Sequence, residues 1–250
     1  MTSGENMDRP EKDRALGELA EFMERKLGDN LIALYEFGEG ACVDWEGDGL
    51  KLLAVLKTLG ARELRILAED RRRWEKNGLP APLMLTKETL LSSTDVFPME
   101  FLEMKEANRF IFGQEDVLSG LEVPLLNLRL QLETQATGKL IHLRQSYIDA
   151  AGDKKRLARL IAVSIEPFTE VMRNALRLLG KSAPVDKEEI IGAFCAESGI
   201  DRVPFDQALE IRRGGKRINL DLDGLEELFS GYLEEIGKMA EKIDRNFSRA

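Results

Sequence analysis

Two short runs of apolar residues dominate the first part of the chain. They span residues 31–37 and 50–56, and polar side chains hardly interrupt either of them. Runs of this length and composition predict strands that are covered on both faces of a sheet. Four glycines lie in the segment 38–49 between the two runs, so we expect a loop there.

The rest of the first half alternates between helical and strand patterns. Apolar residues recur at helical spacing in 11–26 and 61–76, and Thr86 is placed to begin another helix. Further strands are predicted at 83–85, 97–104 and 109–112. This alternation favours an α/β or α+β domain with one central sheet.

The strand pattern disappears after about residue 120. Long helical patterns cover 125–150, 155–179 and 222–243, and shorter ones cover 186–197 and 204–211. Helices without strands bury their apolar faces against one another, so we expect an antiparallel, all-α helical bundle. The predicted parts are a disordered N-terminal segment at 1–10, a mixed α and β domain at 11–120 and a helical bundle domain at 121–250.

The composition is that of a globular protein with an excess of acidic residues. The formal net charge is -9, which disfavours a nucleic-acid partner because phosphate contacts need clustered Lys and Arg. No apolar run approaches the roughly 20 residues of a membrane span, and the N-terminus lacks the apolar core of an export signal. Two isolated cysteines and one histidine predict neither a disulfide framework nor a His-rich metal site. We therefore expect a cytoplasmic protein.

The order of strand, glycine turn, strand, helix, strand and helical bundle resembles the nucleotidyltransferase superfamily. In its two-domain organisation it looks like the bacterial proteins that join this catalytic fold to a helical domain, as aminoglycoside nucleotidyltransferases do. The likeness in element order covers about 16–179, and the sharp motif covers 31–56. The resemblance implies a Gly-Ser turn that approaches a triphosphate and an Asp-x-Asp pair that holds Mg²⁺, completed by a third carboxylate from a later strand.

The chain departs from this motif at its chemically important positions. Gly38 keeps the first position and Gly40 follows, but Glu39 stands where the family has Ser and would repel a triphosphate. Gly49 and Lys51 fall on the two Asp positions. The resemblance thus implies the fold and a degenerate nucleotide-binding motif, with no resident metal or cofactor.

Several other carboxylates lie near the motif. Asp48 is one residue early and alternation places it on the opposite strand face. Glu100 and Glu103 are the candidates for the third carboxylate, and the predicted strand at 97–104 puts them on opposite faces without choosing between them. The acidic loop residues could also rebuild a metal site, although acidic side chains in a glycine-rich loop are usually solvated. These loop residues are Glu39, Asp44, Glu46 and Asp48.

Lys51 and two arginines are the candidate anion-binding residues. The ammonium of Lys51 can pair with a carboxylate, Glu39 or Glu103, and so replace the charge of the metal, which we favour, or it can bind phosphate directly. Arg129 and Arg144 lie fifteen residues apart, near one face of the helix predicted at 125–150. They could line a cleft between the domains, although helical charges more often form solvated or ion-paired faces.

The sequence therefore favours a nucleotidyltransferase-like pseudoenzyme. It has lost metal-dependent nucleotidyl transfer and is kept as a nucleotide-binding or protein-interaction module. The alternative is an active nucleotidyltransferase with rearranged metal ligands, which uses Mg²⁺ and ATP on a small molecule or a protein. The expected partners are a nucleotide and a second copy of the chain, bound through the helical domain.

Overall fold

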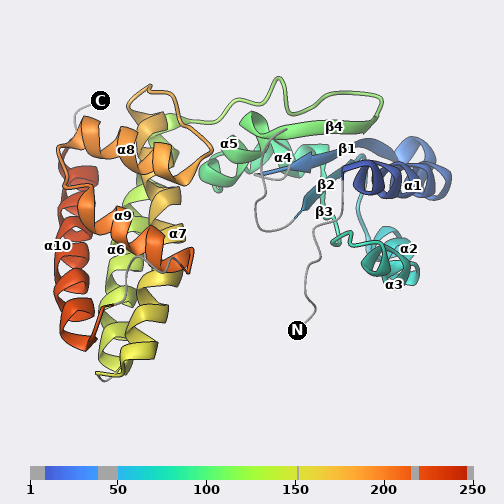
Figure 1. The fold of residues 1–250 in the computed structure, drawn as a ribbon. Helices are drawn as coiled ribbons and strands as arrows, with labels where there is room; N and C mark the ends of the chain where they lie inside the picture. The colour runs from blue at the N-terminus through green and yellow to red at the C-terminus, as the bar shows by residue number, and fades with distance from the viewer. Residues whose placement is uncertain (1–8, 39–49, 151, 215–219, 247–250) are drawn as a thin grey trace. The chain divides into compact units, whose positions relative to one another are not determined.

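The fold is taken from a computed structural model, which describes residues 9–38, 50–150, 152–214 and 220–246 (Figure 1). The chain divides into two compact units, Met1–Pro124 and Leu125–Ala250. The first unit combines a sheet with helices, and the second is helical. Within the described ranges, no helix is both long enough and apolar enough to cross a membrane.

A four-stranded mixed sheet forms the centre of the first unit. Its strands are β1 (Leu31–Phe37), β2 (Lys51–Leu56), β3 (Leu83–Thr86) and β4 (Asn108–Gly113), in the order β3-β2-β1-β4. β1 runs antiparallel to both β2 and β4, and β2 runs parallel to β3. All seven residues of β1 are buried, as their nearly continuous apolar run predicted.

Helices cover both faces of this sheet. One face packs against α1 (Arg9–Leu27), α2 (Ala61–Glu69) and α3 (Arg71–Lys76), and the other against α4 (Lys87–Ser92) and α5 (Pro98–Glu106). On the first face, Trp74 is buried and meets the ring of Phe22 edge-on at 5.1 Å. On the second face, Tyr35 packs in one cluster with Leu90 and Phe101. The three layers are the mixed α and β arrangement with one central sheet that the sequence predicted for this unit.

Three sequence predictions in this unit are wrong in detail. The segment 97–104, predicted to be a strand, lies mostly in the helix α5, which Pro98 begins at a position where its missing N–H costs nothing. The single helix predicted at 61–76 is two helices that meet at Asp70. The first helix begins at Arg9, inside the segment expected to be disordered.

Five helices make up the described part of the second unit. They are α6 (Leu125–Ala150), α7 (Lys154–Leu178), α8 (Lys187–Ser198), α9 (Val203–Arg212) and α10 (Leu222–Asn246). Two Asp side chains fix helix starts, since Asp153 accepts from the backbone of Lys155 and Arg156, and Asp186 accepts from Glu189 N. The helical region that the sequence predicted is confirmed.

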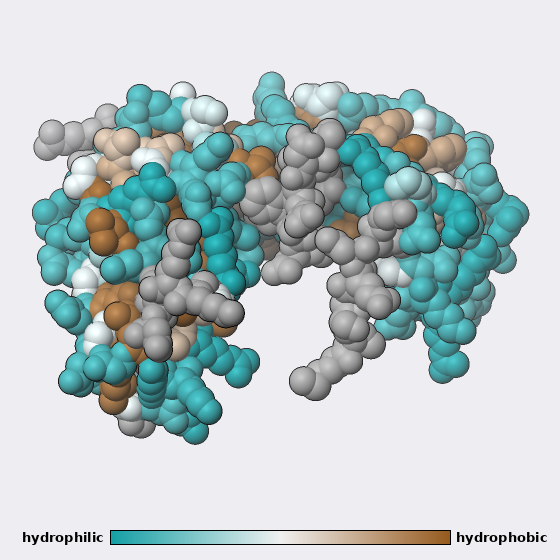
Figure 2. Space-filling view, viewed as in Figure 1, coloured by the Kyte–Doolittle hydropathy of each residue, from teal (hydrophilic) through white to brown (hydrophobic). Residues whose placement is uncertain are grey.

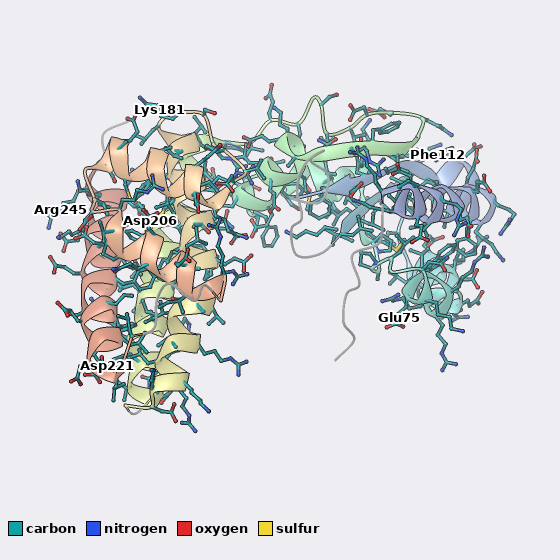
Figure 3. All side chains as sticks on the ribbon, in the orientation of Figure 1. Glu75, Phe112, Lys181, Asp206, Asp221 and Arg245 are labelled. Atoms are coloured by element: carbon teal, nitrogen blue, oxygen red, sulfur yellow. The ribbon has the colours of Figure 1, made fainter. Side chains whose placement is uncertain are left out.

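The core of the second unit is built around an aromatic residue of α10. Tyr232 is fully buried and lies edge-on to Phe168 of α7 and Phe205 of α9. Its hydroxyl group accepts a hydrogen bond of 3.3 Å from Ser164 Oγ, so the one polar atom of the ring has a partner. Charged side chains such as Lys181 and Arg245 project from the outside of the unit (Figure 3), and most of the surface seen in Figure 2 is hydrophilic.

Candidate functional site

The turn that follows β1 requires glycine for two reasons. Gly38 has a φ of 83°, in the left-handed region that other residues rarely adopt. A Cβ atom there would lie 3.1 Å from Oε1 of Glu103 and 3.3 Å from Cδ of Lys51. The backbone N–H of Gly38 donates to the carbonyl oxygen of Ala107 at 2.8 Å. These contacts hold the glycine turn against the end of α5, and a side chain at position 38 would crowd those of Lys51 and Glu103.

Lys51 and Glu103 form an ion pair directly beside this turn. Nζ of Lys51 lies 3.0 Å from Oε1 of Glu103, and the lysine side chain is 49% exposed. Nζ also lies 5.9 Å from the centre of the Phe37 ring. The ion pair with Glu103 is one of the two that the sequence suggested for Lys51. The other candidate partner, Glu39, lies outside the described residues, as do Gly40 and Asp48.

The pairing follows from strand alternation and from the helical nature of α5. Lys51 shares a strand face with Leu53 and Val55, which belong to the cluster that packs against α5. Phe101 and Met104 of α5 are buried in the same cluster. This anchoring directs the neighbouring Glu103 toward Lys51.

The sequence left Glu100 and Glu103 undecided because it placed them on opposite faces of a strand. In a helix, residues three positions apart lie about 60° apart, so the premise was wrong. The structure brings Glu103 to the glycine turn, whereas Glu100 is exposed in the first turn of α5. Only Glu103 of the two therefore contacts Lys51 and approaches Gly38.

The donors that the described residues place at this turn do not fit Mg²⁺. The ion binds through oxygen ligands, several of them carboxylates or water. Among the described residues at this turn, the carboxylate is that of Glu103, and it is already paired with an ammonium group, which cannot act as a ligand and repels a cation. Within the described ranges, no group of three or more His, Cys, Asp or Glu residues could hold a metal ion. The described residues instead place a positively charged group, the ammonium of Lys51, at a tight glycine turn.

A second charged network lies on the opposite face of the sheet, and the sequence analysis missed it. Glu36 of β1 has a side chain that is only 1% exposed, and Nε and Nη2 of Arg109 on β4 lie 2.9 and 2.8 Å from its Oε2. Lys12 of α1 forms an ion pair with its other oxygen. Arg109 also reaches Asp13 at 2.6 Å. The sequence did contain a signal for this network. Glu36 is a charged residue inside an apolar strand, and a buried charge needs a partner.

This network is structural rather than catalytic in character. Burial lowers the pKa of Arg109, but hydrogen bonds to Asp13 and Glu36 outweigh burial and raise that pKa above its ordinary value. The guanidinium therefore stays charged and joins β1, β4 and α1. A permanently charged and ion-paired group of this kind cannot act as a general acid or base.

The two arginine candidates lie in the second unit, on α6. Nε of Arg129 is 2.8 Å from Oε1 of Glu133, one helical turn away. Arg144 is exposed, and within the described residues no ion pair involves it. Their proposed role at a cleft between the two domains stays a prediction.

Comparison with known proteins gives similarity at the level of the fold. No family model matches the chain, and no curated protein matches it. Among solved structures, the chain is similar to the spectinomycin adenyltransferase AAD(9) from Enterococcus faecialis, whose structure was determined with ATP and spectinomycin. The TM-score is 0.58 at 14% identity, and the match covers 93% of this chain and 99% of that one. The chain therefore has a nucleotidyltransferase-like fold, an α+β domain followed by a helical region.

Proposed function

We propose that this chain is a nucleotidyltransferase-like pseudoenzyme that binds a nucleoside triphosphate without Mg²⁺ and does not transfer the nucleotide. The observation that carries the proposal is the contact of 3.0 Å between Lys51 and Glu103 at the Gly38 turn. The resemblance places a metal-binding Asp at position 51. In this chain an ammonium group lies beside the carboxylate instead.

The chemistry of an ammonium group supports binding without catalysis. Lys51 has three N–H donors, of which one faces Glu103, and its half-exposed side chain leaves the others open to phosphate oxygens. A single ammonium can neutralise part of the charge of a triphosphate. It cannot activate an attacking oxygen or stabilise both oxygens of an in-line displacement, as a pair of metal ions does.

The fold supports a nucleotide as the ligand. The similar adenyltransferase was solved with ATP, and the match spans nearly the whole of both chains. The N–H of Gly38 already donates to Ala107, so a phosphate at this turn would be held by the ammonium group of Lys51 rather than by that backbone group. We therefore infer ATP as the first ligand to test.

An active enzyme is the alternative, and it would need different ligands. Carboxylates of the segment 39–49, which lies outside the described residues, would have to hold Mg²⁺ together with Glu103. Lys51 would then have to leave Glu103 when the metal binds. This alternative predicts ATP binding that depends on Mg²⁺, which distinguishes it from the proposal.

Substitutions of Lys51 test the proposed phosphate contact. In EDTA, Lys51→Met is expected to weaken ATP binding about tenfold to a hundredfold, because a hydrogen bond to a charged group is lost. Lys51→Arg, which keeps the charge, should stay within a few-fold of the unmodified chain. The measurement is calorimetric titration with ATP.

Lys87 offers a matched control for these titrations. It is also a partly exposed lysine of the first unit that pairs with a glutamate, at 2.5 Å from Glu115. Lys87→Met should leave ATP binding unchanged. Equal affinities for Lys51→Met and the unmodified chain would show that Lys51 does not touch the phosphates.

A further inference from the structure

A pocket of about 350 Å³ lies in the first unit, at the end of the sheet opposite to the Gly38 turn. Its walls come from the end of α1 with the turn that follows, from the residues after β2, and from the first two turns of α2. Lys51 begins β2 and Lys57 follows its other end, so the two lysines lie roughly 20 Å apart along the strand. The pocket is therefore separate from the site proposed for ATP.

Three basic side chains line this pocket without an acidic partner. They belong to Lys26 at the end of α1, Lys57 directly after β2 and Arg62 in α2. Within the described residues, none of the three side chains forms an ion pair or a hydrogen bond, although the chain has 45 acidic residues against 36 basic ones. Other lysines of the unit, such as Lys51 and Lys87, do pair with a carboxylate. Three like charges around one pocket repel one another, which favours a bound anion.

The place of Arg62 in its helix supports a role in binding rather than in helix stability. Gly60 caps α2, so Arg62 lies in the first turn, where the positive end of the helix dipole disfavours a cation. Glu63 is the acidic residue of that turn, and it accepts from the N–H of Gly60 at 2.9 Å. Lys26 differs, because the last turn of α1 is a favourable place for a cation. Helix stability therefore explains Lys26 but leaves Arg62 unexplained.

Hydrogen bonds of one asparagine hold two walls of the pocket together. Oδ1 of Asn30 accepts from the backbone N–H of Thr58 at 2.8 Å, and Nδ2 of Asn30 donates to the carbonyl oxygen of Thr58 at 3.0 Å. The backbone N–H of Lys57 donates to the carbonyl oxygen of Asn30 at 2.9 Å. Leu27 and Ile66, which pack in the core of this face of the sheet, add apolar lining. The backbone of the site is thus fixed before any ligand binds, which lowers the cost of binding.

We propose that this pocket binds a small phosphate ester that also carries hydroxyl groups, such as a sugar phosphate. Ammonium and guanidinium groups bind phosphate oxygens through charge-assisted hydrogen bonds, so the three cations would hold the phosphate. Asp29 also lines the pocket, and within the described residues its side chain has no partner. Its carboxylate repels a phosphate but accepts hydrogen bonds from hydroxyl groups. A hydroxylated ester therefore suits the pocket better than a bare polyanion.

Calorimetric titration with ribose 5-phosphate tests the proposal. It is carried out in EDTA on the Lys51→Met chain, so that the glycine turn does not contribute. We expect a dissociation constant on the order of 1 mM or below, as for a small ligand held by a few charged groups. Adding Arg62→Gln or Lys57→Gln should weaken binding at least about fivefold. The control, Arg72→Gln, removes the same charge from an exposed residue of α3 outside the pocket and should leave binding within about twofold.

Asp29→Asn tests the contact with the hydroxyl groups. In the same Lys51→Met chain, this change should weaken the binding of ribose 5-phosphate about threefold to tenfold, because a charged acceptor is lost. It should not weaken the binding of inorganic phosphate, which has no sugar hydroxyl groups and gains from the loss of a negative charge. The two probes are therefore expected to respond differently to one substitution.

Three results would overturn this proposal. The first is the absence of binding up to about 10 mM ribose 5-phosphate. The second is equal weakening by Arg72→Gln and Arg62→Gln, which would mean that the ligand senses only diffuse surface charge. The third is tighter binding of ribose 5-phosphate to the Asp29→Asn variant. Every titration uses a chain without Lys51, so these results do not depend on whether the glycine turn binds ATP.

Discussion

Gly113→Ala is expected to lower the free energy of unfolding of the first unit by about 3–5 kcal/mol. Gly113 ends β4 with a φ of 145°, a conformation that alanine rarely adopts. A Cβ atom there would press on the carbonyl oxygen of Ile32 and lie 2.7 Å from Cα of Ala33. Both contacts are with the backbone of the central strand, which cannot move aside as a flexible side chain can.

Urea unfolding followed by tryptophan fluorescence measures this loss. Both tryptophans, Trp45 and Trp74, belong to the first unit, so the signal reports on that unit. Gly17→Ala is the matched control, because Gly17 lies in α1 and a Cβ there would meet nothing within 4 Å. The control should gain about 0.5–1 kcal/mol from helix propensity. A loss below about 1 kcal/mol for Gly113→Ala would contradict the described pairing of Gly113 in β4 with Ala33 in β1.

Glu36→Leu is expected to destabilise the first unit by about 2–4 kcal/mol. The carboxylate is buried between Arg109 and Lys12, and its removal leaves two cations facing an apolar side chain. The same unfolding measurement applies. Lys87→Met provides the comparison, because the Lys87–Glu115 pair is largely exposed and should contribute less than about 1 kcal/mol.

The double variant Glu36→Leu with Arg109→Met separates the ion pair from simple packing. Removing both charges leaves less uncompensated charge than removing Glu36 alone, so the double variant should lose at least 1 kcal/mol less than the sum of the single variants. Strict additivity would mean that Glu36 and Arg109 do not stabilise the sheet through each other.

Local sequence patterns predicted the sheet well where they were unambiguous. The strand at 31–37 has the predicted bounds, and the second strand is one residue shorter than predicted. Both are short apolar runs next to glycines, which leaves little room for another interpretation. The pattern of the segment 97–104 is compatible with both a strand and a helix. Its apolar residues suit a strand, but Phe101 and Met104 are also spaced for one face of a helix. Pro98 followed by Glu100 was the helix-start signal that should have decided it.

The chemistry of the site was predictable only in part. A lysine at a position where the resemblance predicts a carboxylate indicated an ion pair, and Lys51 forms one. That its partner is Glu103 rather than Glu100 depends on the rotation of α5 about its axis. This rotation is set by the burial of Phe101 and Met104, which are tertiary contacts that no local pattern contains. The same limit applies to Glu36, whose partners come from β4 and from α1.

Calorimetric titration of the unmodified chain with ATP, in excess Mg²⁺ and then in EDTA, tests the central claim most directly. If Lys51 replaces the metal, ATP should bind in both conditions with dissociation constants within about threefold of each other, since no step of binding needs the ion. Binding that appears only with Mg²⁺ would contradict the proposal, because it would require a carboxylate site for the metal and would favour an active nucleotidyltransferase with rearranged ligands.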